Sequence, residues 1–270
     1  ITVNHFTALR QAIMDDYDQN KHFEFGTDNP TLMEKPFWKY MVCNPHLGAY
    51  DARKENNGDF VDDSNAWRPT WCFARFGATQ TYLPDGRLIH IGGEHEDCYD
   101  SDFQIYNDVV VIRNPRMVRA HYMYSLPVPS NFPVETKQNA ASLEPEILGT
   151  SRPEDVTIYG YPEHVFPPTD FHTATYVKNS DDEEDFIYII GGLGYLNSSH
   201  RRETHVYRLG LSDFRIHRMK TTGIGPLGCT ERHRAALKIV GGRKMIEICL
   251  KDHQCYRLDV ETVVWDTISD

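Results

Sequence analysis

The sequence predicts an all-β fold made of repeated four-stranded sheets, a β-propeller with a short N-terminal helical extension. Three observations predict it. From about residue 71, short runs rich in β-branched and aromatic residues are separated by Gly, Pro, Asp and Asn, as strands are separated by turns. Features of these runs recur at a spacing near 50 residues. Helical periodicity is confined to the front of the chain.

Apolar residues at the front recur at spacings of three and four, which predicts a helix over about residues 7–18. A second short helix is expected within the aromatic-rich stretch 35–55. A polar and acidic loop follows at residues 56–66. We therefore expect residues 1–70 to form a helical or irregular extension that packs on a domain of residues 71–270. The residues expected to pack the second helix are Phe37, Trp38 and Met41.

Twelve strands are predicted after residue 71, and such a density of short strands is typical of a sandwich, a barrel or a propeller. The residues near 116–153 are rich in Pro and read as an insertion or as a degenerate fourth sheet. The predicted strands are 78–83, 87–91, 108–112, 156–161, 173–177, 186–190, 205–209, 214–219, 235–240, 245–250, 254–258 and 263–268.

Internal repeats decide among these architectures. A Tyr-Arg-Leu triplet begins at Tyr207 and again at Tyr256, 49 residues later. Each is followed nine residues after its Tyr by a bulky residue, Ile216 or Trp265. Gly pairs that begin at Gly92 and Gly191 close apolar runs 99 residues apart, about two periods. Four strands per period is the pattern of a propeller blade.

These features resemble the kelch repeat, whose marks are a Gly pair closing the second strand and a spaced Tyr and Trp later. The resemblance covers residues 75–268 and is clearest over 171–268. It departs from the pattern in the last unit, where Gly241-Gly242 lies in the turn between the first and second strands. At least three blades are recognisable. The number of blades stays open, as does closure of a half-propeller by a second chain.

Composition limits the function classes. The chain has 270 residues, of which 40% are hydrophobic and 25% charged, so disorder, collagen and coiled coil are excluded. The formal charge of −11 disfavours nucleic acid and anionic membranes as partners. Six cysteines without a CxxC motif, and no visible signal peptide, predict reduced thiols in the cytoplasm. The sequon at Asn197 is the one feature that favours secretion.

The loop after the first Gly pair, residues 94–102, carries five carboxylates and one imidazole. Carboxylate oxygens with one His suit a divalent cation such as Fe²⁺, Mn²⁺ or Zn²⁺, and the candidate metal ligands are Glu94, His95 and Asp97. Paired carboxylates are also able to serve as acid and base. The alternative is a solvated acidic loop that holds no ion.

The resemblance to kelch propellers implies that the first strand of each unit is innermost and that its start faces one mouth of a central channel. Superposing the units places Gly77, His172 and Arg234 at one position. Charged side chains two residues apart then share a face. The residues expected to converge on this mouth are Arg75, Asp170, His172, Arg232 and Arg234. The alternative is ion pairing between sheets that seals the axis.

Two functions follow from this arrangement. The first is a module that binds a protein or a small anionic or polar ligand, with homodimerisation as a further association. The second is an enzyme of lyase, isomerase or hydrolase type, assisted by a divalent metal, with Asp170, His172 and His95 as its catalytic residues. The candidate ligand-binding residues are Arg75, Arg232 and Arg234 from the first strands, and Tyr195 and Arg202 from the loop after the second Gly pair.

Overall fold

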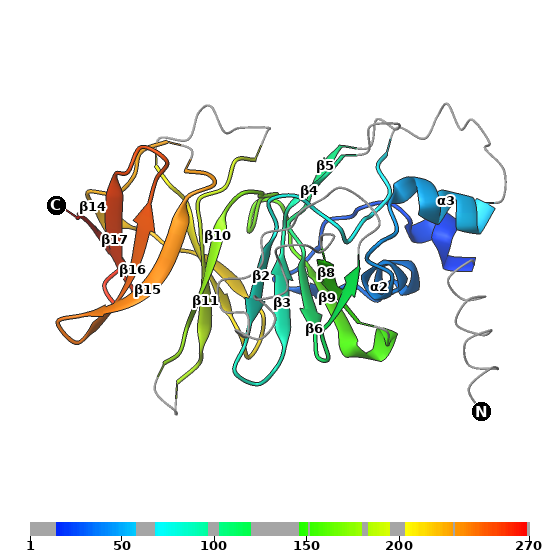
Figure 1. Ribbon diagram of the computed structural model, residues 1–270, viewed down its shortest axis with the longest axis horizontal. Helices are drawn as coiled ribbons and strands as arrows, with labels where there is room; N and C mark the ends of the chain where they lie inside the picture. The colour runs from blue at the N-terminus through cyan, green and yellow to red at the C-terminus, as the bar shows by residue number, and fades with distance from the viewer. Residues whose placement is uncertain are drawn as a thin grey trace.

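The computed structural model describes residues 15–57, 68–96, 103–119, 146–150, 152–179, 183–194, 203–228 and 230–268 (Figure 1). Antiparallel β-sheets dominate these ranges and helices are few, so the prediction of a β-rich fold is confirmed at this level. Among the described residues the sheets do not close into a ring. No helix in these ranges has the length and apolar character needed to cross a bilayer.

Twelve strands form three antiparallel meanders that follow chain order, and we call them the first, second and third sheets. Each predicted strand is present, with ends that differ by at most two residues. The first sheet contains β2 (Thr79–Tyr82), β3 (Leu88–Ile91), β6 (Val109–Ile112) and β9 (Val156–Gly160). The second contains β10 (Thr173–Val177), β11 (Phe186–Ile190), β12 (Val206–Gly210) and β13 (Ile216–Arg218). The third contains β15 (Arg234–Val240), β16 (Arg243–Cys249), β17 (Cys255–Asp259) and β18 (Val264–Thr267).

The three sheets stand in a row, and their first strands β2, β10 and β15 are neighbours (Figure 1). The middle sheet is buried on both faces. Ile187 and Ile189 of β11 face the first sheet, whereas Tyr188 and Ile190 face the third. This position explains why β11 is a continuous apolar run rather than an alternating one. Tyr207 fills space between the first and second sheets, and Trp265 fills space between the second and third.

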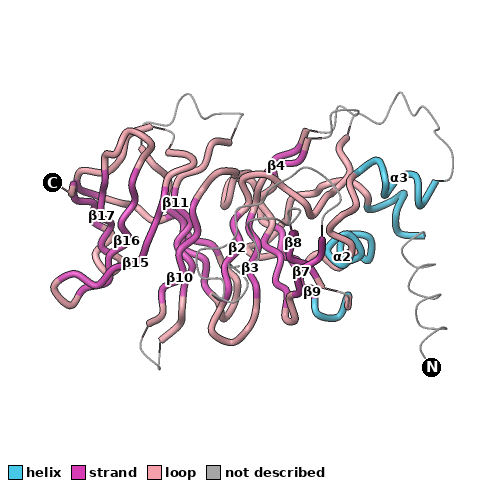
Figure 2. Tube along the Cα trace, viewed as in Figure 1, coloured by secondary structure: helices cyan, strands magenta, loops and turns pink. Residues whose placement is uncertain are grey.

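The N-terminal segment covers the outer face of the first sheet, and the helices lie at this end of the row alone within the described residues (Figure 2). Residues 15–20 are helical, and the earlier part of the helix expected over 7–18 lies outside the described residues. The second expected helix is confirmed as α2 (Pro36–Cys43), and α3 (Ala49–Asn57) follows it. The indole of Trp38 stacks on Trp71 with ring centroids 5.0 Å apart. The buried residues of α2 are Phe37, Trp38, Met41 and Val42.

The segment near 116–153 is an insertion within the first sheet. Strand β6 pairs directly with β9, so the chain leaves the sheet after its third strand and returns to form the fourth. The ends of the insertion, β7 (Arg116–Arg119) and β8 (Glu146–Gly149), pair with each other. The 99 residues between the Gly pairs therefore span one sheet and an insertion rather than two sheets.

Short strands that the sequence did not predict extend the sheet edges. Strand β1 (Thr31–Leu32) pairs with β9 at the outer edge of the first sheet. Strand β14 (Thr222–Gly223) pairs in parallel with β18 at the outer edge of the third. Strands β4 (Glu94–His95) and β5 (Gln104–Ile105) form a separate two-stranded ribbon after the first Gly pair. Because these strands have only two residues each, they are too short for alternation of apolar and polar residues to predict them.

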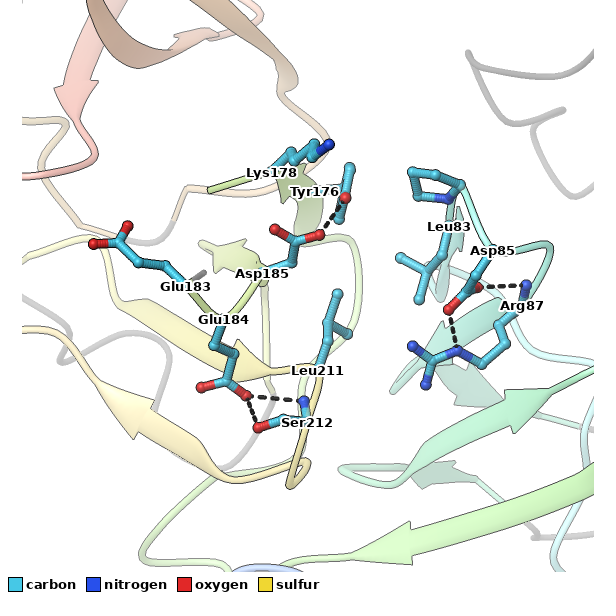
Figure 3. Close-up of a pocket in the computed structure, with 11 residues that line it drawn as sticks. Leu83, Asp85, Arg87, Tyr176, Lys178, Glu183, Glu184, Asp185, Leu211 and Ser212 are labelled. Atoms are coloured by element: carbon cyan, nitrogen blue, oxygen red, sulfur yellow. Dashed lines mark hydrogen bonds and ion pairs between the residues drawn. The ribbon is translucent and has the colours of Figure 1, made fainter. Parts of the chain in front are cut away.

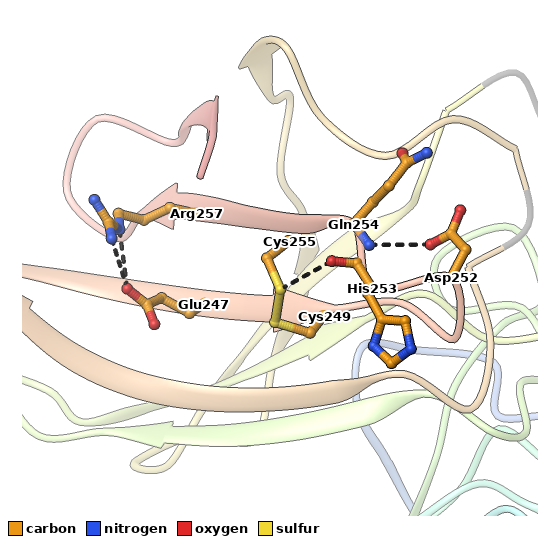
Figure 4. The surroundings of a disulfide bond; sticks show 7 residues. All are labelled: Glu247, Cys249, Asp252, His253, Gln254, Cys255 and Arg257. Atoms are coloured by element: carbon orange, nitrogen blue, oxygen red, sulfur yellow. Dashed lines mark hydrogen bonds and ion pairs between the residues drawn. A yellow bond between two sulfur atoms is a disulfide. The ribbon is translucent and has the colours of Figure 1, made fainter. Parts of the chain in front are cut away.

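The outer face of the third sheet is polar and carries a disulfide between Cys249 and Cys255 (Figure 4). The expectation of reduced thiols is wrong for this pair. The two residues are direct partners in the β16–β17 register, with Cα atoms 4.2 Å apart, which brings their sulfur atoms together. Beside them on the same face, Arg257 forms an ion pair with Glu247 at 2.7 Å. Of the other cysteines in the described ranges, Cys43 and Cys72 take part in no disulfide.

Candidate functional site

The starts of the three first strands share one backbone feature. Gly77, Phe171 and Arg232 each adopt a left-handed conformation, with φ of 60°, 51° and 49°. These three residues are therefore equivalent, and the superposition expected from the sequence is displaced by one residue from each sheet to the next. A slip of one residue moves a side chain to the opposite face of a strand. This displacement separates several of the side chains expected at one mouth.

Arg75 is enclosed between the first sheet and the N-terminal segment rather than open to a ligand. Its guanidinium pairs with the carboxylate of Asp108, and both side chains are fully buried. The guanidinium also lies 3.5 Å from the ring centroid of Tyr106 and donates to the carbonyl oxygens of Cys72 and Gly92. Arg75 is therefore held by an ion pair, but its partner belongs to the same sheet and not to a neighbouring one.

His172 is likewise enclosed, at the junction of the first and second sheets. Its Nε2 lies 3.0 Å from Thr79 Oγ1, and burial lowers the pKa of this imidazole to about 3. The next junction repeats the contact, because His233 Nε2 lies 2.8 Å from Thr173 Oγ1 and burial lowers the pKa of His233 to about 4. Both rings are therefore neutral at pH 7 and link neighbouring sheets.

The acidic members of the expected site do come together. Asp170 is buried ahead of β10, and its Oδ1 accepts a hydrogen bond from the Gly194 amide at 2.9 Å. Glu94, half-buried at the start of β4, lies close enough to Asp170 for the two carboxyl groups to affect each other's pKa. Glu94 Oε2 and Asp170 Oδ2 are buried and have no hydrogen-bond partner in the described part of the chain. Glu94 reaches this place because its amide and carbonyl pair with Phe76, just before β2. We call Glu94 and Asp170 the acid pair.

The electrostatics of the acid pair are unusual for exposed-loop carboxylates. Burial, followed by the charge of Asp170, raises the pKa of Glu94 to about 7. Glu96 adds to this rise, and the positive charge of Arg232 opposes it. Burial also raises the pKa of Asp170, although the Gly194 amide and Glu94 act in the opposite direction, while Glu231 raises it further. The ionisation of Glu94 beside Asp170 is therefore disfavoured up to a pH of about 7.

The remaining candidates lie in different places. Arg232 is exposed, and its guanidinium lies 4.1 Å from the ring centroid of Phe171, close enough to the acid pair to affect its pKa. Arg234 is exposed on the outer face of the third sheet, opposite Cys249, away from that pair. His95 is buried, with Nδ1 3.0 Å from the carbonyl oxygen of Ala74. Asp97, Tyr195 and Arg202 lie outside the described residues.

Within the described part of the chain, no group of three or more His, Cys, Asp or Glu side chains is arranged to hold a metal ion.

Sequence reasoning missed two charged residues that the structure places here. Asp108 neutralises Arg75. In the sequence it could have been noticed as an acidic residue directly before the apolar run that forms β6. Glu231 lies one residue before the left-handed Arg232 and forms an ion pair with Lys251 at 3.4 Å.

No protein-family model matches the chain, and no curated protein matches it. The case for a function therefore rests on the geometry and chemistry of the residues themselves.

Proposed function

We propose that the chain is a binding module whose three sheets are blades of a kelch-like propeller. The support is the order of the strands, in which each four-stranded meander follows the chain and the first strands are neighbours. The two Gly pairs also play the same part at successive junctions. Gly93 and Gly192 each donate a hydrogen bond of 2.8 Å to the segment that enters the next sheet, at Thr169 and Thr230.

We further propose that the module holds a cationic group, such as the basic side chain of a partner protein or a small amine or guanidine, on the acid pair. The site contains Asp170, one of the residues expected at the mouth, but its charge favours a cation over the anionic ligand that the arginines suggested. Arg75 is neutralised inside the protein and His172 is neutral. Glu96 acts on Glu94 and Glu231 acts on Asp170, and the cations that the described residues place beside these four acids are Arg232 and Lys251.

The buried carboxyl oxygens Glu94 Oε2 and Asp170 Oδ2, which have no hydrogen-bond partner in the described part of the chain, are the observation that carries this proposal. Neighbouring carboxyl groups that oppose each other's ionisation gain free energy when a cation binds between them. The net charge of −11 adds a long-range field that raises the local concentration of cations. Binding should therefore strengthen as the pH rises through about 7, where Glu94 loses its proton.

Nα-acetyl-arginine amide and its neutral isostere Nα-acetyl-citrulline amide test the proposal by NMR titration or calorimetry at pH 6 and pH 8. We expect the arginine compound to bind, several-fold more tightly at pH 8, and the citrulline compound to bind at least tenfold more weakly. Glu94→Gln should weaken binding at least fivefold and remove the pH dependence. Glu163→Gln, an exposed carboxylate, is the matched control. Equal binding of both compounds, or unchanged binding by Glu94→Gln, would refute the proposal.

A second function, general acid–base catalysis, is favoured by the same pKa near 7, because a group that titrates at the working pH transfers protons most effectively. In this case Glu94 is the proton-transferring residue and Asp170 sets its pKa. Turnover of a panel of p-nitrophenyl esters and glycosides should then follow a pH profile with an inflection near 7, lost in Glu94→Gln. Turnover that Glu94→Gln leaves intact would exclude this function for the site.

A further inference from the structure

A pocket of about 430 Å³ lies at the end of the sheets opposite the acid pair (Figure 3). Three hairpin turns surround it: the β2–β3 turn of the first sheet, and the β10–β11 and β12–β13 turns of the second. Its volume lies within the range of sites for small organic ligands, roughly 300–1,000 Å³. Its lining includes Leu83, Asp85, Tyr176, Glu184, Asp185 and Leu211.

The pocket has an apolar part that two sheets supply. Leu83 and Leu211 are more than nine-tenths buried and belong to the core between the first and second sheets. The half-buried ring of Tyr176 on β10 packs against the same core, and its hydroxyl points toward Asp185 (Figure 3). A ligand in this pocket would therefore contact hydrocarbon from both sheets, which favours a molecule with an apolar body.

The polar part consists of carboxylates that the protein already holds in place (Figure 3). Asp185 accepts hydrogen bonds from the Tyr176 hydroxyl at 2.6 Å and from the Asn179 amide at 2.8 Å. Glu184 accepts a hydrogen bond from the Ser212 amide at 2.9 Å. Groups fixed in this way lose little conformational freedom when a ligand binds, which raises affinity.

The approach of Glu184 depends on a glycine. A Cβ atom at Gly210 would lie 2.7 Å from Glu184 Oε1, so a larger residue would push this carboxylate aside. On the facing turn, Asp85 accepts hydrogen bonds from the amide of Arg87 at 3.0 Å and from its Nε at 2.8 Å. The pocket therefore has acceptors on both sides of its apolar part.

The charges of the lining favour a cation. Asp85, Glu183, Glu184 and Asp185 outnumber Lys178 and Arg87, and Arg87 is already paired with Asp85. Burial alone would raise the pKa of Asp185, but hydrogen bonds from Tyr176 and Asn179 and the charges of Lys178 and Lys244 hold it below its usual value. Burial and the neighbouring Asp185 raise the pKa of Tyr176 to about 12, so its hydroxyl keeps its proton.

We propose that this pocket binds a protonated organic amine with an apolar body, at a site separate from the acid pair. The ammonium group would donate hydrogen bonds to the carboxylates of Glu184 and Asp185, while the body covers Leu83 and Leu211. An organic cation fits better than a bare metal ion, because no three acidic groups among the described residues are arranged to share one. This inference does not depend on the function proposed for the mouth.

The test compares three probes of one shape and different charge: 2-phenylethylamine, 2-phenylethanol and phenylacetate. In ¹H–¹⁵N NMR titrations of the whole chain, we expect the amine to shift amide signals of the three turns, among them Arg87, Asp185 and Ser212. The alcohol should bind at least fivefold more weakly, and phenylacetate should give no saturable shift. Because Asp185 stays ionised, the affinity for the amine should change less than twofold between pH 6 and pH 8.

Two variants locate the contact. Asp185→Asn and Glu184→Gln should each weaken binding of 2-phenylethylamine about five- to tenfold. Asp213→Asn, which removes an exposed carboxylate on the β12–β13 turn outside the pocket lining, should leave it unchanged. If Asp185→Asn fails to fold, as its NMR dispersion would reveal, Glu184→Gln decides alone. The proposal is overturned if the alcohol binds as tightly as the amine, if neither pocket variant weakens binding, or if the shifts map to Glu94 instead.

Discussion

Glu94 shows how a single side chain can make a loop sensitive to pH. Its carboxyl group lies in a partly buried position next to Asp170, and both effects oppose its ionisation. Sequence reasoning identified the acidic loop, but it could not tell which of the five carboxylates would be drawn against the first strand of the second sheet. Glu94 is held there by a β-bridge to Phe76, and no local sequence pattern predicts this bridge.

The raised pKa of Glu94 predicts a pH dependence of stability. Glutamate titrates near 4.5 when exposed and near 7 here, so the folded state binds more protons between these values. The free energy of unfolding should therefore fall as the pH rises from about 4.5 to 7 and change no further from this source above it. Glu94→Gln should remove this decline. Melting temperatures at pH 5 and pH 7.5 test this, with Glu163→Gln as a control that keeps the decline. Parallel curves for Glu94→Gln and the parent would contradict the assignment.

Arg75 illustrates the opposite outcome, in which the sequence singled out the right residue and misjudged its part. Its partner Asp108 is 33 positions further along the chain, and the two meet only because β3 and β6 pair behind them. From spacing alone, an arginine ahead of a strand looks available to a ligand. The pairing of the sheets makes it an internal cation.

At the scale of elements, the Gly pairs hold successive sheets together. Gly92 and Gly191 close the second strands of the first and second sheets, both with left-handed φ, and a Cβ atom at Gly191 would lie 2.1 Å from the carbonyl oxygen of Thr230. Such a contact with backbone cannot be relieved by a side-chain rotation. The pairs are therefore sites of close approach between one sheet and the segment that enters the next.

A pair of glycine substitutions separates this close approach from backbone conformation. Gly191→Ala should lower stability by several kcal/mol, because it combines a left-handed φ with the clash at Thr230. Gly241→Ala is the matched control, since Gly241 also has a left-handed φ but meets no atom within 4 Å. It should cost only about 1–2 kcal/mol. Urea unfolding measures both, and equal losses would show that packing at Thr230 is unimportant.

Most of the longer elements were predictable, the exceptions being α3, β7 and β8, whereas none of the two-residue strands was. Twelve strands of three to seven residues follow from alternation and turn residues, whereas the two-residue strands β1, β4, β5 and β14 contain too few residues to show a period. The insertion near 116–153 was ambiguous for a different reason. Its length matched one repeat, and only the pairing of β6 with β9 distinguishes an insertion from another sheet.

On the scale of the whole molecule, the N-terminal segment completes the fold. It supplies a buried aromatic layer to a sheet face that water would otherwise reach. Trp38 is central to this layer, because it is fully buried, stacks on Trp71 and donates a hydrogen bond to the Asn20 carbonyl at 2.8 Å.

Truncating this layer should destabilise the entire row. We expect Trp38→Ala to lower the free energy of unfolding by about 3–5 kcal/mol. Phe25→Ala, which truncates an aromatic side chain that is 41% exposed, should cost far less. Denaturation followed by circular dichroism tests this, since the β signal of all three sheets should be lost at lower denaturant in Trp38→Ala. An unchanged midpoint would mean that the segment is a separate attachment.

The disulfide also bears on the molecule as a whole. The expectation of a cytoplasmic protein rested on reduced thiols, and the bond between Cys249 and Cys255 removes that support. Disulfides persist mainly in oxidising compartments. The sequon at Asn197 is the other feature of the sequence that favours secretion over the cytoplasm.

The two ends of the row of sheets differ, and this difference affects how further copies of the chain could stack on it. Identical sheets stacked face to face, with a bare apolar face at each end, would bind the next copy and polymerise without limit, as head-to-tail contacts do when they fail to close. Here the first sheet ends beneath Trp38 and Met41, and the third presents Arg234, Glu247 and Arg257 around the disulfide. A copy that arrived at either end would meet a covered face or a charged one. The two ends of the row therefore differ, and neither is a bare apolar copy of the faces that pack between the sheets.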